Sequence, residues 1–360
     1  MLDKRRPIPS SAPMENALQT NHPQPLTIWT MTSGAAGMKS QVTGLAKAIA
    51  TLTPTKIQEK TVNLKSWASP FPGHLTPFPW HSIITEPSPL TPPWPDLLIT
   101  SGRRTSSTSI AIGRASNGKT YRVHLQNPQT PSRYFDLVCP MAHDQLKGTN
   151  IITTTTALHK VTNNDLTNAA TTWKPLWQAR LERPNRGPTL GILLGGKNKS
   201  SGFDQNRLES LISLITKAAT EQKAEILITP SNRTEPFVID ALHKQFANTP
   251  NIWLWNKEGD NPYHAILALA DHFLITSDSV SMISEALYTP KPVHIFPLTN
   301  IRRRHQLFLE ILQQDNHIAW ANETINFSVK SSRTPIDETA KIAHIICEKL
   351  NQHHLSQADH

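Results

Sequence analysis

Short polar side chains gather at one point of the segment 272–296, between an apolar run and an apolar stripe at helical spacing. This pattern predicts a buried strand, a polar turn and a helix, in that order. The amides and the dipole at the amino end of such a helix bind phosphate, and Glu285, about two turns further in, would reach a ribose. An ordinary capped helix with a solvated glutamate is the alternative. The candidate phosphate ligands are Ser277, Asp278, Ser279 and Ser281.

A glycine- and lysine-rich segment, residues 195–202, lies between a predicted strand at 189–194 and another helical stripe. Glycine, lysine and serine at such a turn suit a phosphate, although their spacing is not that of a P-loop NTPase. A flexible surface loop is the alternative interpretation. The candidate ligands here are Gly196, Lys197, Ser200 and Ser201.

The first half of the chain has two comparable turns. Residues 33–37 follow a predicted strand at 26–30 and open a helix, but their sequence, SGAAG, is not the GxGxxG motif. Residues 101–107 place Arg103 and Arg104 among hydroxyl residues where the next helix begins, which suits an anion or a sugar. A polar helix cap with exposed arginines explains this second turn equally well.

Strands and helices alternate in both halves, which predicts an α/β protein of two doubly wound domains facing each other across a cleft. The polar turns fall at the strand ends that would border this cleft, which is where ligands bind in such sheets. Residues 67–95, rich in Pro and Trp, are expected to form an irregular loop with aromatic anchors. Further strands are expected at residues 56–62, 95–100, 121–126, 135–140 and 151–155, and at 224–229, 252–255 and 293–296.

Composition indicates the domain boundaries. The polar, proline-punctuated start of the chain predicts disorder, and RPNRGP at residues 183–188 is the clearest linker. The predicted units are a disordered lead-in at 1–25, an N-terminal Rossmann-like domain at 26–162, a helix and linker at 163–188, a C-terminal Rossmann-like domain at 189–335, a helix at 336–350 and a polar tail at 351–360.

The 360 residues include 36 Lys and Arg and carry a formal charge of +9, so the surface favours phosphorylated ligands, acidic lipid head groups or nucleic acid. Nucleic acid fits worst, because the basic residues are scattered and not interleaved with aromatic ones. The arginine run 302–304 would lie near a phosphate or a membrane, or form a solvated face.

Two cysteines in the whole chain fit a reducing cytosol. No apolar run reaches the roughly 18 residues that a membrane-spanning helix needs. A cytoplasmic location follows, with peripheral attachment to the inner membrane as the alternative.

The motifs stand in an order that resembles the GT-B class of nucleotide-sugar glycosyltransferases, nearest to the peptidoglycan N-acetylglucosaminyltransferase pattern, over roughly residues 26–315. The resemblance implies that the second domain binds a nucleotide-diphosphate sugar as substrate, that no cofactor is used, and that Glu285 holds the ribose. It also implies an acceptor side on the first domain, where HLQNP at residues 124–128 resembles a strand ending in a Gln-Asn pair. The acceptor-side residues would be Ser33, Gly34, Gly37, Arg103, Arg104, Thr105, Gln126 and Asn127.

Several phrases of the sequence are similar to the characteristic blocks of the mitochondrial fission family named for the elongated mitochondria of plant mutants, which has many bacterial members. They cover nearly the whole folded chain. The resemblance implies a GT-B-like fold, and the plant members imply recruitment of a fission GTPase to the organelle surface, but no biochemical activity is implied. The phrases are TSGAAGMKSQ, PDLLITSGRRTS, VHLQNP, FDLVCPMAHD, TTTALHKVT, LGGKNKSSGF and TSDSVSMISEA.

The candidate catalytic residues depart from the pattern of inverting GT-B enzymes, which often present a histidine as general base at the end of the first glycine loop. Met38, Lys39 and Ser40 stand there instead, and a lysine is protonated at neutral pH unless burial changes that. Lys39 would more readily hold a phosphate or a carboxylate, and His143, beside Asp144, and His159 are the other candidate bases. No cluster of His and carboxylates has the spacing of a metal site.

Two hypotheses of function follow. In the first, the chain is a metal-independent glycosyltransferase acting on a cell-envelope acceptor, with the leaving diphosphate stabilised by helix amides and cations. In the second, it is a non-catalytic adaptor of the fission family at an anionic membrane surface, which the basic charge and the missing histidine favour.

Overall fold

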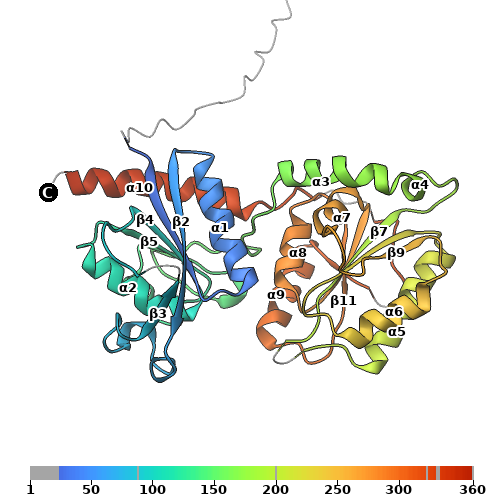
Figure 1. Cartoon of the computed structure of the whole chain (residues 1–360), viewed down its shortest axis with the longest axis horizontal. Coiled ribbons are helices and arrows are strands. Elements are labelled where there is room, and N and C mark those ends of the chain that lie inside the picture. Colours follow the sequence, from blue (N-terminus) through green and yellow to red (C-terminus); the bar gives the residue numbers. More distant parts are fainter. Residues whose placement is uncertain (1–23, 87–88, 199–200, 322, 330–332, 359–360) are drawn as a thin grey trace, which may run out of the picture.

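The computed structural model describes residues 24–86, 89–198, 201–321, 323–329 and 333–358. The chain forms two α/β lobes that lie side by side, each built around one sheet (Figure 1). The disorder predicted for residues 1–25 concerns a segment that lies outside the described residues, apart from its last two.

The N-terminal lobe is built on the sheet β3-β2-β1-β4-β5-β6, in which every strand is parallel to its neighbour except β3. Its central strands are buried on both faces, because helices and loops cover the two sides, and this explains their continuous apolar sequences. The elements are β1 (Leu26–Thr32), α1 (Ala36–Ala50), β2 (Thr55–Leu64), β3 (Ile83–Glu86), β4 (Leu97–Ser101), α2 (Ser106–Ala115), β5 (Tyr121–Leu125) and β6 (Leu137–Cys139).

The C-terminal lobe repeats the plan with the all-parallel sheet β12-β11-β10-β7-β8-β9. The strand order reverses between β7 and β10, and ligands of such sheets bind outside the strand carboxyl ends at this point. The elements are α3 (Asn163–Leu176), α4 (Gln178–Leu181), β7 (Thr189–Leu194), α5 (Gln205–Thr220), β8 (Glu225–Pro230), α6 (Pro236–Phe246), β9 (Ile252–Leu254), α7 (Tyr263–Leu269), β10 (His272–Thr276), α8 (Val280–Leu287), β11 (Val293–Phe296), α9 (Arg303–Gln314) and β12 (Ala319–Trp320).

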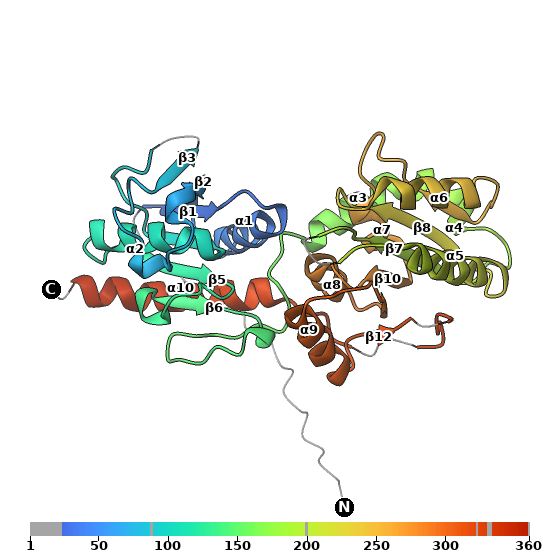
Figure 2. The ribbon, with the colours of Figure 1, turned by 90° about the horizontal axis from the view of Figure 1, so that it is seen from below.

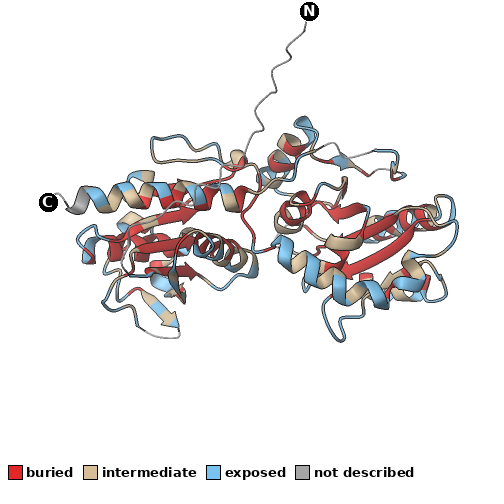
Figure 3. Ribbon diagram, turned by 90° about the horizontal axis from the view of Figure 1, so that it is seen from above, coloured by how far each residue is buried: buried red, intermediate tan, exposed pale blue. Residues whose placement is uncertain are grey.

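The last helix, α10 (Glu338–Ala358), returns to the N-terminal lobe and runs along it (Figures 1 and 2). Ile342, Ala343 and Ile346 are fully buried against α1 and the first sheet, so the end of the chain completes the core of its beginning. Figure 3 shows buried residues concentrated in the two sheets and in the helix faces that cover them. The helix was expected to end at residue 350, but the described chain stays helical to Ala358.

The prediction of a strand at residues 151–155 is wrong. This segment makes only isolated bridges, Val138 to Ile151 and Met141 to Thr154, and then leaves the sheet. Its continuation packs on α1, where a Cβ atom added to Gly44 would lie 2.1 Å from the carbonyl oxygen of His159. The short edge strands β3 and β12 were not expected, and β3 interrupts the irregular loop predicted for residues 67–95.

Truncation of Ile346 to Ala should destabilise the N-terminal lobe, because Ile346 is fully buried and its removal leaves a cavity. We expect a loss of about 2–5 kcal/mol in the free energy of unfolding, measured by urea denaturation. Leu355→Ala on the exposed face of the same helix is the matched control and should change it by less than about 0.5 kcal/mol. Equal effects of the two substitutions would contradict this role of α10.

Candidate functional site

A cavity of about 480 Å³ lies between the lobes at the carboxyl ends of their strands. The N-terminal lobe contributes Ala35 and Met38, from the turn before α1 and its first residues. The C-terminal lobe contributes the rest from the segments that follow β7, β8, β10 and β11, including the first turns of α8 and α9. These residues are Asn198, Arg233, Asp278, Ser279, Val280, Ser281, Arg302 and His305.

Two helix amino ends meet beside this cavity. A Cβ atom added to Gly37 in the first turn of α1 would lie 3.1 Å from Oγ of Ser281 in the first turn of α8. Neither helix has a side-chain cap, since Ala35 carries no acceptor and the Ser279 hydroxyl makes no capping bond. In the part of the chain that the structure describes, no protein acceptor pairs with the first three amides of either helix. Both positive dipole ends therefore point to one place, which favours an anion.

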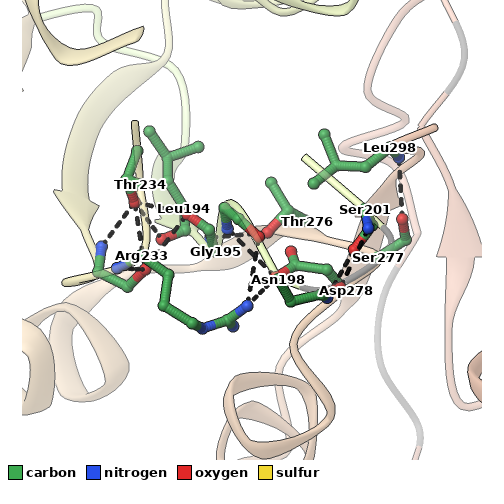
Figure 4. A network of polar contacts seen from close by, with 12 residues as sticks. Leu194, Gly195, Asn198, Ser201, Arg233, Thr234, Thr276, Ser277, Asp278 and Leu298 are labelled. Atoms are coloured by element: carbon green, nitrogen blue, oxygen red, sulfur yellow. Dashed lines mark hydrogen bonds and ion pairs between the residues drawn. The ribbon is translucent and has the colours of Figure 1, made fainter. Parts of the chain in front are cut away.

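Cationic side chains surround the same cavity. Arg233 donates from Nη1 to Oδ2 of the buried Asp278 at 2.7 Å, and the two side chains point toward each other below Gly195 (Figure 4). Arg302 precedes α9, and His305 lies in its first turn. Burial, with Arg304 and the other arginines nearby, lowers the pKa of His305 despite the opposing charge of Asp278. At neutral pH the cavity wall therefore holds an arginine–aspartate pair, a second arginine and a neutral imidazole.

The predicted phosphate turn divides into two parts. Ser277 accepts a hydrogen bond at Oγ from the amide of Leu298 at 2.9 Å, and Asp278 accepts one from the amide of Gly196 at 3.1 Å. These two side chains hold loops together. Ser279 and Ser281 line the cavity and stay candidates for contact with a ligand.

The segment 195–198 does not offer its amides to a ligand in this structure. The amide of Gly195 donates to Oγ1 of Thr276 at 2.7 Å, and that of Lys197 donates to the carbonyl oxygen of Arg233 at 2.9 Å. Asn198 and Ser201 bond to each other through both backbone and side chains. The phosphate role predicted for Gly196, Lys197 and Ser201 stays a prediction, and Ser200 lies outside the described residues.

On the N-terminal lobe, most predicted acceptor-side residues bond to other groups of the same lobe. Arg103 donates from Nη2 to the carbonyl oxygen of Ser69 at 2.9 Å, and Thr105 donates to that of Gly102 at 2.9 Å. Gln126 donates to Gln41 at 3.0 Å, and Asn127 accepts from the amide of Gln129 at 2.8 Å. Ser33 and Gly34 precede α1, and Arg104 is exposed. Gly37 adjoins the cavity through Ser281, but the others are not among its lining residues.

Two of the three candidate bases, Lys39 and His143, make contacts away from the cavity. Lys39 forms an exposed ion pair with Glu59, with 2.8 Å between Nζ and Oε2. His143 is buried with its ring edge-on to Phe308, and burial, followed by the charges of Arg304 and His305, lowers its pKa to about 4. Neither is among the residues that line the cavity.

Next to His143, an ion pair joins the two lobes. Oδ1 of Asp144 lies 2.7 Å from Nη2 of Arg304 in α9, and the Asp144 side chain is almost fully buried. Burial raises the pKa of Asp144, and the Arg304 guanidinium opposes that rise. The pair holds the lobes together at the edge of the cavity.

The side chain of Glu285 is buried in the C-terminal lobe, whereas the predicted contact with a ribose needs an accessible carboxylate. Its Oε2 accepts a hydrogen bond from the hydroxyl of Tyr263, and the carboxyl is buried behind the first turn of α8. Burial raises its pKa to about 7, against the opposing effects of Tyr263 and Lys160. The ribose contact stays a prediction, because a ligand would have to compete with Tyr263.

The sequence analysis did not identify Arg233 or His305 as residues that line the cavity. Arg233 follows β8, and parallel neighbours place their carboxyl ends at one edge, so its loop had to lie near those after β7 and β10. The arginine run 302–304 was noticed but not resolved: Arg302 lines the cavity, Arg304 joins the lobes, and Arg303 pairs on the surface with Glu310.

Within the described residues, no group of three or more His, Cys, Asp or Glu side chains could hold a metal ion. None of the helices in the same residues is long and apolar enough to cross a bilayer.

Replacing Arg304 by Gln should destabilise the protein at neutral pH, because it leaves the buried Asp144 carboxylate without its cation. The folded-state pKa of Asp144 is raised, so its ionisation costs stability as pH rises, and the substitution enlarges that cost. We expect a loss of about 1–3 kcal/mol at pH 7 that shrinks toward about pH 4, measured by chemical denaturation. Arg303→Gln is the control, and a pH-independent loss would refute the assignment.

Two curated proteins are similar to this chain. The mitochondrial fission protein ELM1 of Arabidopsis thaliana is 25% identical over 279 residues, which cover 71% of this chain and 64% of that protein. The chain thus spans less than two thirds of the length of that relative. The protein RP120 of Rickettsia prowazekii (strain Madrid E) is 27% identical over 283 residues, which cover 70% of this chain and 79% of that protein.

A solved structure has the same architecture. UDP-GlcNAc 2-epimerase from Methanocaldococcus jannaschii superposes with a TM-score of 0.52 at 11% identity, covering 90% of this chain and 100% of that chain. The likeness, with the two parallel sheets, confirms the predicted GT-B-like fold of two doubly wound lobes. Residues 36–350 match the family described as mitochondrial fission ELM1. Because this match includes most of the described residues, the chain belongs to the mitochondrial fission ELM1 family.

Proposed function

We propose that the cavity between the lobes binds the diphosphate of a nucleoside-diphosphate sugar. The observation that carries the proposal is the pair of uncapped helix amino ends, those of α1 and α8, that meet beside the cavity. Each end supplies amide donors and a positive partial charge. An anion bound in the cavity beside both ends would accept hydrogen bonds from both lobes at once, so it would also hold the lobes together.

The charges of the lining residues support an anion of this kind. Asp278 does not repel it, because its carboxylate is paired with Arg233 and hydrogen-bonded to Gly196. Arg302 then adds its positive charge to those of the helix ends. The volume of about 480 Å³ lies within the range of small-ligand sites, about 300–1,000 Å³.

The fold supports the nucleotide-sugar part of the proposal by analogy alone. The protein from M. jannaschii is named for UDP-GlcNAc, a nucleoside-diphosphate sugar, and at 11% identity its likeness to this chain is one of fold. The reaction class that fits the two-lobed cavity is glycosyl transfer to a second substrate, which the N-terminal lobe would bind. We propose that this acceptor is a molecule of the cell envelope. Helix amides and Arg302 would stabilise the leaving diphosphate, and His305 would donate a hydrogen bond to it.

A non-catalytic adaptor is the second candidate, and one observation favours it. Lys39 and His143, the residues expected to act as bases, both make contacts away from the cavity. An adaptor of this kind would keep the nucleotide sugar as a bound ligand and not consume it. The release of UDP from a UDP-sugar in the presence of the protein separates the candidates, because an enzyme would release UDP and an adaptor would not.

The binding proposal is tested by titration calorimetry with UDP-GlcNAc, GDP-mannose and ADP-glucose, each against the wild-type protein and Arg302→Gln. We expect one nucleotide class to bind and the substitution to weaken it about tenfold to hundredfold, because a charge-assisted hydrogen bond is lost. Arg302 is a better choice than Arg233, whose removal would leave Asp278 buried and unpaired. Arg303→Gln, one residue away and paired on the surface, should bind like the wild type. Absence of binding by all three sugars would end the proposal.

The affinity for the nucleotide sugar should rise as pH falls. His305 has a lowered pKa and is neutral at pH 7, and a bound diphosphate would favour its protonated form, so binding takes up a proton. We expect tighter binding at about pH 5.5 than at about pH 7.5, with the change removed in His305→Gln. A nucleotide sugar is the right probe, since the terminal phosphate of a free nucleotide itself titrates near pH 6, about the same range. His243→Gln, far from the cavity, is the control, and an unchanged pH profile in His305→Gln would count against the contact.

A further inference from the structure

One segment of the N-terminal lobe exposes large apolar side chains. Residues 66–85 contain no Asp, Glu, Lys or Arg, yet they form the surface of the protein beside β2 and β3. Trp67 is 48% exposed, Phe71 41%, Leu75 61% and Phe78 74%. We call these three aromatic residues, together with Leu75, the aromatic surface. A soluble protein rarely groups such side chains in solvent unless they meet a partner.

The backbone of this segment is built to present these side chains. Phe78 has a φ of 45°, a left-handed conformation that a bulky residue rarely adopts. It is fixed by the amides of His81 and Ser82, which both donate to its carbonyl oxygen, at 2.9 and 3.1 Å. Trp80 anchors the turn by stacking on Trp94, with ring centroids 5.7 Å apart. Strain held in place by its surroundings points to a functional role for the exposed ring.

The aromatic surface lies at the rim of the lobe, near two exposed arginines. The loops next to the edge strand β3 project from the body of the N-terminal lobe (Figure 1). Arg103 bonds to the carbonyl oxygen of Ser69, which places the exposed Arg104 beside this segment. His74 stacks on Tyr134, with ring centroids 5.4 Å apart, which brings up the exposed Arg133. Among the described residues, neither Arg104 nor Arg133 has an acidic partner.

We propose that the aromatic surface inserts into an anionic lipid bilayer, with Arg104 and Arg133 contacting the head groups. Trp and Phe on a loop, flanked by basic residues, suit the boundary between head groups and acyl chains. The four residues are spread over short helical turns and bends of a proline-rich segment, an irregular surface that a fluid interface accommodates more readily than a rigid protein partner. Each inserted ring contributes apolar burial, and each arginine adds attraction to anionic lipid.

This attachment differs from the one that the arginine run 302–304 suggested. Arg302 lines the cavity, Arg303 pairs with Glu310, and Arg304 pairs with Asp144. The run therefore has other partners, and the membrane contact is assigned to the opposite lobe. The inference does not rest on nucleotide binding.

Flotation of the full chain with vesicles tests the proposal. The wild type should float with vesicles of phosphatidylglycerol and phosphatidylcholine, and Trp67→Ser/Phe71→Ser/Phe78→Ser should bind at least about tenfold more weakly. The matched control replaces exposed apolar residues elsewhere, Leu176→Ser/Phe237→Ser/Leu355→Ser, and should bind like the wild type. Equal binding of the two variants, or no binding by the wild type, would overturn the proposal.

Charge is tested separately with Arg104→Gln/Arg133→Gln. This variant should lose about tenfold or more in affinity for the anionic vesicles and little for vesicles of phosphatidylcholine alone. Arg114→Gln, an exposed arginine at the far end of α2, is the control. An equal loss on both vesicle types would contradict the head-group contact.

A third measurement does not depend on the folding of the multiple variant. Brominated lipid should quench the fluorescence of the wild type, and Trp67→Phe should remove part of that quenching while still binding. No quenching of the wild type would refute insertion. Sedimentation of the wild type and the triple Ser variant shows whether the surface instead joins two copies of the chain, and a dimer lost in the variant, without vesicle binding, would overturn the membrane assignment.

Discussion

The loops at the strand carboxyl ends of the C-terminal lobe depend on the hydrogen bonds that the carboxylate of Asp278 accepts. It accepts from the amide of Gly196 and from the guanidinium of Arg233, so one buried side chain joins the loops that follow β7, β8 and β10. Gly196 is required there, since a Cβ atom on it would lie 2.2 Å from the carbonyl oxygen of Arg233. Because these loops bond to each other, the amide donors that remain for a ligand come from the helix ends.

The two lobes face each other because the chain crosses between them twice. The amide of Ala157 donates to Oγ of Ser284 in α8 at 3.0 Å, and Oγ1 of Thr339 accepts from the amide of His159 at 3.1 Å. The first crossing thus bonds to a helix of the second lobe and to the second crossing. Together with the Asp144 and Arg304 pair, these contacts keep the amino ends of α1 and α8 opposite each other.

Much of the fold could be predicted from the sequence, since buried parallel strands are short apolar runs and the helices between them carry apolar residues at helical spacing. The segment 189–194 and the helix ahead of Pro290 are examples. The strand expected at 151–155 did not form, because this segment makes only isolated bridges and the amide of Thr155 donates to Glu338 of α10, a partner that the local pattern does not encode. Short edge strands such as β12 carry too few residues for a pattern.

The candidate site was predictable as a place and less so as a set of side chains. Polar residues after β10 had to lie at the sheet edge, because strand direction decides that. Which of them face the cavity depends on partners far away in the sequence, such as Arg233 for Asp278 and Tyr263 for Glu285.

The return of α10 to the first lobe has a consequence for synthesis on the ribosome. Ile346 and its neighbours belong to the core around α1, so the N-terminal lobe lacks part of its interior until the end of the chain is made. The sheet of the C-terminal lobe ends at Trp320, before that helix begins. We therefore expect the second lobe to fold first and the lobe translated first to fold last, which reverses the usual order of domains in a nascent chain.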